Sequence, residues 1–289
     1  MIIVDYSQTV ISNIMADIGN NKKAKLEVNL IRHMVVNTIR SHYKEFKDEY
    51  GDMTIACDSK KYWRKDFFPF YKANRKKVRQ ESGHDWNLIF DTINMLKQEL
   101  KDNFPWKVVE VEGAEADDII ATYIKNKDPN EPVVIVSGDH DFIQLQKYSN
   151  VSQWSPIKNK FVKCIGNPKD ILFEHIIKGD KGDGVPNVLT DDDSIVNGKR
   201  QRPIQSKKLE AWKNNPTEMP HDSGFVRNFE RNQTLVDLSR IPKNIEDAIQ
   251  LAFIKAEPPF DVNLNKDILL NYFNEHKLNK MIENIEEFV

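Results

Sequence analysis

Acidic side chains recur in this 289-residue sequence directly after short runs of Val and Ile. Asp5, Asp58 and Asp139 each come within three residues of the end of such a run. A denser group, Glu115-Ala116-Asp117-Asp118, follows a further run of the same kind. Carboxylates gathered this closely repel one another unless a cation neutralises them, and oxygen-only ligands favour Mg²⁺ or Mn²⁺ over zinc. Two such ions about 4 Å apart can activate a water and stabilise the leaving oxygen of a phosphodiester, so the pattern indicates metal-dependent hydrolysis.

Each acidic group also has an ordinary explanation. Acids at a helix start cap free amides, but three acids within residues 115–118 exceed that need. The stretch Asp139-His140-Asp141 is either a metal-binding pair or a plain turn. The stretch from Gly179 to Gly184 is either a solvated loop rich in turns or the source of two further ligands, Asp180 and Asp183.

A basic and aromatic stretch begins two residues after Asp58 and runs from Lys60 to Arg79. A run of charge is usually only a solvated face. Here aromatic residues are interleaved with the basic ones, and base stacking together with phosphate contact is how single strands are gripped. We therefore expect a nucleic-acid-binding arm beside the acidic pocket. Its candidate contact residues are Lys60, Arg64, Lys65, Tyr71, Lys76, Lys77 and Arg79.

The remaining charge and composition are less specific. A looser basic stretch with Lys199, Arg200 and Arg202 fits either duplex contact or a mobile polar loop. The net charge of −2 decides nothing by itself, because 42 basic and 44 acidic residues can be segregated onto different surfaces. No run approaches the roughly 20 apolar residues that span a bilayer. The absence of a basic leader and the presence of only two cysteines, without metal-ligand spacing, predict a reducing, cytosolic setting.

The elements that must position these groups alternate in the first half of the chain. Strand-like runs cover residues 2–4, 53–57, 108–111 and 133–136, with helical apolar spacing between them. This alternation predicts an α/β fold with a mostly parallel central sheet flanked by helices. Ligands of such sheets bind beyond the carboxyl ends of the strands, where the acids stand.

Strand signals vanish from about residue 167. We therefore predict an α/β domain over residues 1–166 and a smaller helical domain over residues 167–289. Helical patterns lie around residues 245–255 and from residue 267 onward. We expect the apolar residues of the last pattern to pack on the smaller domain, with partner docking as the alternative.

Four motifs, in their order and spacing, resemble the flap endonuclease/5′-3′ exonuclease family and most closely its phage T4-type RNase H members. The resemblance runs from about Ile3 to Val188 and continues more weakly beyond. The motifs are Tyr71-Lys72-Ala73-Asn74-Arg75, Glu115-Ala116-Asp117-Asp118, Ser137-Gly138-Asp139-His140-Asp141-Phe142 and Lys178-Gly179-Asp180-Lys181-Gly182-Asp183.

The resemblance implies two metal sites, occupied by two Mg²⁺ ions for which Mn²⁺ can substitute. Asp118 would lie close to them, and Lys72 and Arg75 would stabilise charge on the attacked phosphate. The ligands would be Asp5, Asp58, Glu115, Asp117 and Asp139 for the first site and Asp141, Asp180 and Asp183 for the second.

The resemblance also implies two nucleic-acid elements. A helical arch over about residues 60–100 would cover the single-stranded 5′ end, and a helix–three-turn–helix element at about residues 171–188 would hold the duplex. In that element backbone amides, including those of Gly182 and Gly184, and a K⁺ ion would bind phosphates. The sequence departs from the family here. Cellular members continue with a Gly-Ile-Gly-x-Lys-like run, whereas this chain continues with Val185-Pro186-Asn187-Val188, so the second half of the element is altered.

Together these features predict a structure-specific 5′-3′ exonuclease and flap endonuclease of the RNase H type, which removes RNA primers and adjacent DNA during replication. By resemblance it would act as a phage-encoded monomer in the host cytoplasm, with a single-stranded-DNA-binding protein as a partner. Its substrates would be DNA and RNA–DNA hybrids with a flap, nick or 5′ end. Two alternatives are a PIN-like ribonuclease, which would lack the arch, and a non-catalytic DNA-structure-binding protein, which would be expected to lack some metal ligands.

Overall fold

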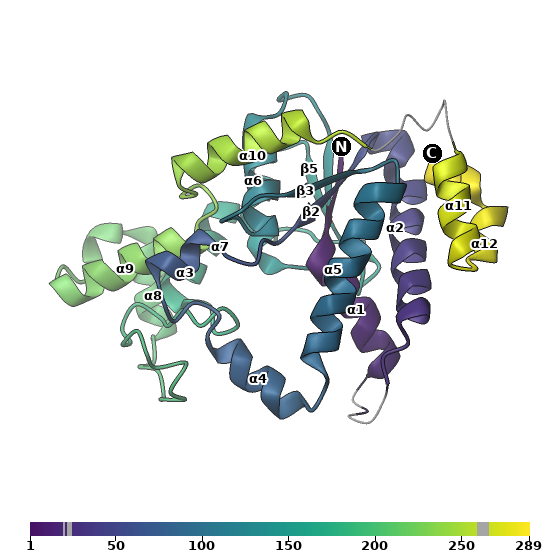
Figure 1. Ribbon diagram of the computed structural model, residues 1–289. Helices are drawn as coiled ribbons and strands as arrows, with labels where there is room; N and C mark the ends of the chain where they lie inside the picture. The colour runs from purple at the N-terminus through teal and green to yellow at the C-terminus, as the bar shows by residue number, and fades with distance from the viewer. Residues whose placement is uncertain (20, 22–24, 259–265) are drawn as a thin grey trace.

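A six-stranded sheet forms the centre of the computed structural model, which describes residues 1–19, 21, 25–258 and 266–289 (Figure 1). The strand order is β3-β2-β1-β4-β5-β6. Strands β1 to β5 pair in parallel, and β6 pairs antiparallel with β5. The strands are β1 (Ile2–Asp5), β2 (Met53–Cys57), β3 (Lys107–Glu110), β4 (Val133–Val136), β5 (Val151–Ser155) and β6 (Lys160–Phe161). The predicted α/β fold with a mostly parallel sheet is therefore confirmed.

The sequence did not predict two of these strands, β5 and β6. Strand β5 contains Ser152 and Gln153, and this polar content hid it among loop-like residues. Gln153 is nevertheless buried, because its side-chain amide donates to the carbonyl oxygens of Ser137 and Asp139 at 3.0 and 2.6 Å. The strand thus braces the loop that follows β4.

Helices cover both faces of the sheet, because the strands are apolar on both sides. In β1, Ile2 and Val4 pack on one face and Ile3 on the other, as the alternation of a β-strand requires. Helices α1 (Tyr6–Ile18), α2 (Val28–Tyr50) and α5 (Trp86–Asn103) cover the first face. The second is covered by α6 (Ala116–Asn126), α10 (Lys243–Lys255) and the 3-10 helix η1 (His140–Lys147). Within the described ranges no helix has the length and apolar character needed to cross a membrane.

Between β2 and β3 the chain leaves the sheet and returns through α3 (Trp63–Phe67), α4 (Asn74–Ser82) and α5. Figure 1 shows α4 at the outer end of this excursion, with α5 leading back toward the sheet. Helix α4 buries none of its residues, whereas α5 buries Ile89, Leu96 and Leu100 against the core. The region predicted to form the arch is therefore largely helical, and its outer part is solvated.

A second helical group lies beside the excursion and consists of α7 (Pro168–Lys178), α8 (Ser206–Asn214), η2 (Pro216–Glu218) and α9 (Ser223–Val236) (Figure 1). Turns, and no helix, occupy the fully described stretch between α7 and α8. The carbonyl of Pro186 in this stretch accepts from Arg231 and Asn232 of α9, both at 2.9 Å. Helix α9 therefore holds the turns in place through buried polar side chains.

The segment with α11 (Asp267–Glu275), α12 (Asn279–Glu283) and η3 (Ile285–Phe288) packs beside α2 and α5 (Figure 1). Phe273 and Phe288 are fully buried in the core of the first sheet face. Glu287 forms ion pairs with Arg40 and Lys44 of α2. The expectation that this segment packs on the smaller domain is therefore wrong. Its apolar pattern specified a buried face but not the surface that buries it.

Candidate active site

The carboxyl ends of three neighbouring strands bring Asp5, Asp58 and Asp139 to one edge of the sheet. Asp5 ends β1, which lies between β2 and β4, the strands that lead into Asp58 and Asp139. The Asp5 carboxylate caps α1 by accepting from the amide of Gln8 at 3.1 Å, and it accepts from the Ser137 hydroxyl at 3.0 Å. The side chain of Asp5 is thereby fixed toward the end of β4.

The start of α6 adds two further acids to this edge. Glu115 is the N-cap residue of α6, and the amide of Ala116 donates to the Asp58 carboxylate at 2.8 Å, which ties the helix start to the end of β2. Asp117 follows in the first turn. Burial and the charge of Asp139 raise the pKa of Asp117 well above its usual value, so the two carboxylates lie within strong electrostatic reach.

Burial and mutual repulsion disfavour the charged form of the carboxylates at this edge of the sheet. Burial raises the pKa of Asp5 to about 7, and the charges of Asp58 and Asp139 add to the shift. The pKa of Asp139 is also raised, by burial and by the charge of Asp141. A divalent cation would relieve this repulsion, and the donors are carboxylate oxygens, the ligands of Mg²⁺-like ions. The residues present therefore fit a hard divalent cation.

A second acidic group stands beside the first and comes from η1 and the turn after α7. The amide of Asp183 donates to the Asp180 carboxylate at 2.9 Å, and the charges of Asp183 and Asp180 both contribute to the raised pKa of Asp139. Gly179 starts this turn with φ 68°, and a Cβ there would lie 2.4 Å from the carbonyl oxygen of Val185. Only glycine fits, and the tight turn brings both acids to the site.

Lys72 and Arg75 from the basic arm reach the same acids. The Lys72 ammonium pairs with Glu115 and lies 3.7 Å from Asp183, and the Arg75 guanidinium pairs with Asp183. Burial disfavours the charged form of Lys72, but the carboxylates of Asp183 and Glu115 outweigh it and raise its pKa. The structure thus brings this basic pair into contact with two of the predicted metal ligands, Glu115 and Asp183.

Three predicted site residues lie in the interior instead of facing a substrate. Arg64 is 2% exposed, and its guanidinium pairs with Glu115 and Asp118, so the prediction that it contacts nucleic acid is wrong. The Asp118 carboxylate also accepts from the indole of Trp63, which makes it part of this buried network. Tyr71 is buried, with its hydroxyl donating to Asp183 at 2.8 Å, so it cannot serve as a stacking platform.

The other predicted contact residues differ in their exposure. Gly184 is buried, with φ 75°, and its amide donates to the carbonyl of Lys181, so that amide is not free for a phosphate. Arg79 is half-buried and stacks over Trp86 and Phe90. The side chains that remain exposed are those of Lys60, Lys65, Lys76, Lys77, Lys199, Arg200 and Arg202, and Gly182 is exposed as well. Of these, Lys199 pairs with Asp193 at 2.8 Å.

Sequence reasoning missed His175, in the last turn of α7. Its Nδ1 lies 3.2 Å from Asp141 and its Nε2 3.0 Å from Asp180. Burial disfavours the imidazolium, but the hydrogen bonds to Asp141 and Asp180 outweigh it and raise the pKa of His175 to about 10. No sequence signal marked this residue, because the contact depends on how α7 packs against η1.

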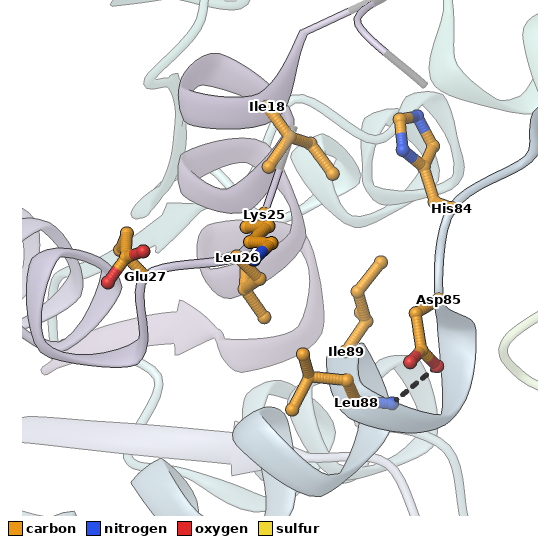
Figure 2. Close-up of a pocket in the computed structure, with 8 residues that line it drawn as sticks. All are labelled: Ile18, Lys25, Leu26, Glu27, His84, Asp85, Leu88 and Ile89. Carbon is orange, nitrogen blue, oxygen red and sulfur yellow. Dashed lines mark hydrogen bonds between the residues drawn. The ribbon is translucent and has the colours of Figure 1, made fainter. Parts of the chain in front are cut away.

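One cavity among the described residues lies away from the predicted metal ligands. It has a volume of about 310 Å³ and is lined by residues near the end of α1 and the start of α5. Figure 2 shows Leu26, Leu88 and Ile89 facing it, with Asp85 accepting from the amide of Leu88 at 3.1 Å. The candidate site is instead the open acidic edge of the sheet.

Comparison with known proteins finds similarity along nearly the whole chain. Residues 1–171 match the family model described as the 5′-3′ exonuclease N-terminal resolvase-like domain, and residues 166–288 match the model of the T4 RNase H C-terminal region. The ribonuclease H of Enterobacteria phage T4 is 32% identical in a match that covers 99% of this chain and 95% of that protein. A 5′-3′ exonuclease of Streptomyces coelicolor is 28% identical over 49% of this chain and 52% of its own length.

Solved structures share the fold at lower sequence identity. The T5 D15 protein co-crystallised with metal ions has a TM-score of 0.62 and 18% identity, covering 88% of this chain and 98% of that one. A T5 D15 flap endonuclease variant in a pseudo-enzyme-product complex with DNA and metal ions has a TM-score of 0.61 and 19% identity, covering 88% of this chain and 97% of that one.

Proposed function

Because the chain belongs to the 5′-3′ exonuclease family, we propose that it is a structure-specific 5′-3′ exonuclease and flap endonuclease of the RNase H type. Its role would be to remove RNA primers and adjacent DNA during replication. The observation that carries the proposal is the convergence of the strand-end acids, the start of α6 and the base of the basic arm at one edge of the sheet. The ribonuclease H of phage T4, similar over nearly the whole chain, supports the type of activity.

Eight acids would hold two Mg²⁺ ions, with Mn²⁺ as a substitute. Bound there, the ions would supply a hydroxide-like water and stabilise the leaving oxygen of the phosphodiester. The acids of the first site are Asp5, Asp58, Glu115, Asp117 and Asp139, and those of the second are Asp141, Asp180 and Asp183. Ser137 and Gln8 orient the first set, because they hold the Asp5 carboxylate and the loop after β4.

Lys72 and Arg75 would bind the non-bridging oxygens of the attacked phosphate. Within the protein, Lys72 pairs with Glu115 and Arg75 pairs with Asp183. Metal cations bound to those two acids would weaken both ion pairs. Tyr71 keeps its neighbour Lys72 in place, because its hydroxyl donates to Asp183 at 2.8 Å and lies 3.1 Å from Glu115. Arg64 and Asp118 act as positioning residues beneath them.

The strands of the substrate would follow the exposed basic residues. Lys60, Lys65, Lys76 and Lys77, in and around α3 and α4, would contact the single-stranded 5′ end. Lys199, Arg200 and Arg202 would contact the duplex. We also propose that a K⁺ ion binds at the turn after α7 and that a single-stranded-DNA-binding protein is a partner. The protein would act as a monomer in the cytoplasm of a phage-infected cell.

The decisive experiment uses 5′-labelled and 3′-labelled flap, nicked and RNA–DNA hybrid duplexes with and without Mg²⁺. We expect cleavage from the 5′ side that requires the ion. Asp139→Asn should lower turnover more than about a hundredfold with little loss of DNA binding, since even supporting residues of metal sites cost about 10- to 100-fold. Asp91→Asn, a change at an exposed acid of α5, is the matched control and should cleave normally.

Other outcomes would contradict the proposal. Undiminished turnover in Asp139→Asn would refute the metal assignment. A preference for plain single-stranded RNA would favour a PIN-like ribonuclease, and metal-independent binding without product would favour a non-catalytic DNA-binding protein.

A further inference from the structure

His175 lies between two of the acids of the second site. Its two ring nitrogens face different carboxylates, Nδ1 that of Asp141 at 3.2 Å and Nε2 that of Asp180 at 3.0 Å. One donor atom from each of the three residues lies within 4.8 Å of the other two, which is close enough for a single ion to touch all three. The donors come from three separate pieces of chain, namely η1, α7 and the turn after it.

The position of His175 is fixed by the helix that carries it. Asn167 caps α7 by accepting from the amide of Lys169 at 2.9 Å, and the next two residues after His175, Ile176 and Ile177, are buried. The imidazole itself is only 22% exposed. A swing out into solvent would therefore break contacts on both sides of the ring.

The contacts match the way histidine binds metals in proteins. A ligating imidazole gives one nitrogen to the ion and donates the N–H of the other to a carboxylate or carbonyl. Here either nitrogen can take the ion once it has given up its proton, while the other keeps its carboxylate partner, Asp141 or Asp180. By contrast, the donors expected at the first site are carboxylate oxygens alone.

We propose that His175 is a ligand of the second metal ion. This site would then prefer ions that accept nitrogen ligands over Mg²⁺, whereas the first site would not. The inference rests on the proposed two-metal function. Imidazole suits transition ions such as Zn²⁺, Fe²⁺ and Ni²⁺, whereas carboxylate and water suit Mg²⁺ and Mn²⁺. Mn²⁺ serves in the test below as a probe of whether the histidine nitrogen is a ligand. The two sites of the protein would then differ in the ion they select.

The test measures Mn²⁺ bound to the protein without DNA, by electron paramagnetic resonance. Pulsed spectra of the wild type should show coupling of bound Mn²⁺ to a histidine nitrogen, and His175→Gln should lack it. The Gln variant should also bind Mn²⁺ about tenfold more weakly at one site, while Mg²⁺ binding, measured by competition, changes less than threefold. His140→Gln is the matched control, because it removes an exposed imidazole from the same acidic loop and should leave the coupling intact.

Two results would overturn the inference. Absence of nitrogen coupling in the wild type would mean that His175 stays outside the coordination sphere. Unchanged or tighter Mn²⁺ binding by His175→Gln would mean that the imidazole only pairs with the acids and competes with the ion. Circular dichroism and thermal unfolding establish that the variants are folded. Failure of the proposed function would show separately, as a wild type that cleaves no flap with any divalent ion.

Discussion

Arg64 belongs to the most basic stretch of the chain and yet lies fully inside the protein. It links three separate parts of the fold, because its guanidinium pairs with Glu115 and Asp118 at the start of α6 and donates to the carbonyl of Leu235 at 2.9 Å. The neighbouring Lys65 is exposed. The start of the basic arm, at α3, is therefore joined to Glu115 and Asp118 by a buried network of ion pairs.

Replacing Arg64 with Met should lower the free energy of unfolding by about 3–5 kcal/mol, because it leaves the buried Asp118 carboxylate without a cationic partner and Glu115 with Lys72 alone. Lys65→Met is the matched control, with the same change of side chain at an exposed position, and should leave stability nearly unchanged. Urea denaturation measures both. An Arg64→Met protein as stable as the wild type, but weaker in DNA binding, would restore the surface role that the sequence suggested.

At the residue scale, the sequence could predict that the strand-end acids lie together. It could not predict which side chains hold those acids in place. Asp5, Asp58 and Asp139 follow strands, and parallel strands end at one edge, so sequence position implies spatial proximity. The environment of Arg64 depends on which side of the short helix α3 faces inward, which its five residues do not reveal. His175 depends likewise on the packing of one helix on another.

The turn after α7 is the element whose form depends most on glycine. Gly179 combines φ 68° with ψ −176°, and a Cβ would meet the carbonyl oxygens of Val185 and Pro186 at 2.4 and 2.5 Å. Gly198 in the following turns also has a positive φ, 64°, but no atom lies within 4 Å of a Cβ placed there. Comparing substitutions at Gly179 and Gly198 therefore distinguishes the cost of a steric collision from the cost of backbone strain.

Gly198→Ala should cost about 1 kcal/mol, the strain of an L-residue at positive φ. Gly179→Ala should cost about 2–4 kcal/mol, because a collision with backbone adds about 1–3 kcal/mol to that strain. Chemical denaturation compares the two proteins, and fluorescence anisotropy with a nicked duplex should show weaker binding only for Gly179→Ala. Equal losses of stability would mean that the turn can move aside.

Among the elements, the apolar strands were predicted and the polar ones were not. Strands β1 and β4 are continuous runs of Val and Ile apart from the terminal Asp5 of β1, and the sequence marked both. Strand β5 carries Gln153, whose burial depends on hydrogen bonds to the neighbouring loop. The predicted change to helices after residue 167 matches the described strands, none of which lies beyond Phe161.

At the scale of the whole molecule, the last helices complete the core of the first sheet face. Phe288 packs with Phe104 and Trp106, with ring centroids 6.0 and 5.9 Å apart. Its amphipathic segment was predicted, but the surface it covers was not, because apolar periodicity carries no information about the partner. Contact with α2 and α5 followed only from the three-dimensional arrangement.

Phe288→Ala should lower the free energy of unfolding by about 3–5 kcal/mol, the usual cost of a large buried aromatic. Glu283→Ala, at an exposed position of α12, is the matched control and should have little effect. Thermal and urea unfolding provide the measurement. A fully stable Phe288→Ala protein that loses only partner binding would instead support the docking role for this segment.

The position of Phe288 also sets an order of events during synthesis. It shares one apolar cluster with Ile2 and Val4, so residues from both extremes of the described chain meet in a single layer. At about 5–20 residues per second, the ribosome needs on the order of ten seconds or more to pass from Trp106 to Phe288. Throughout that interval the nascent chain carries Phe104 and Trp106 without their cover, and this layer closes only after the last helices emerge.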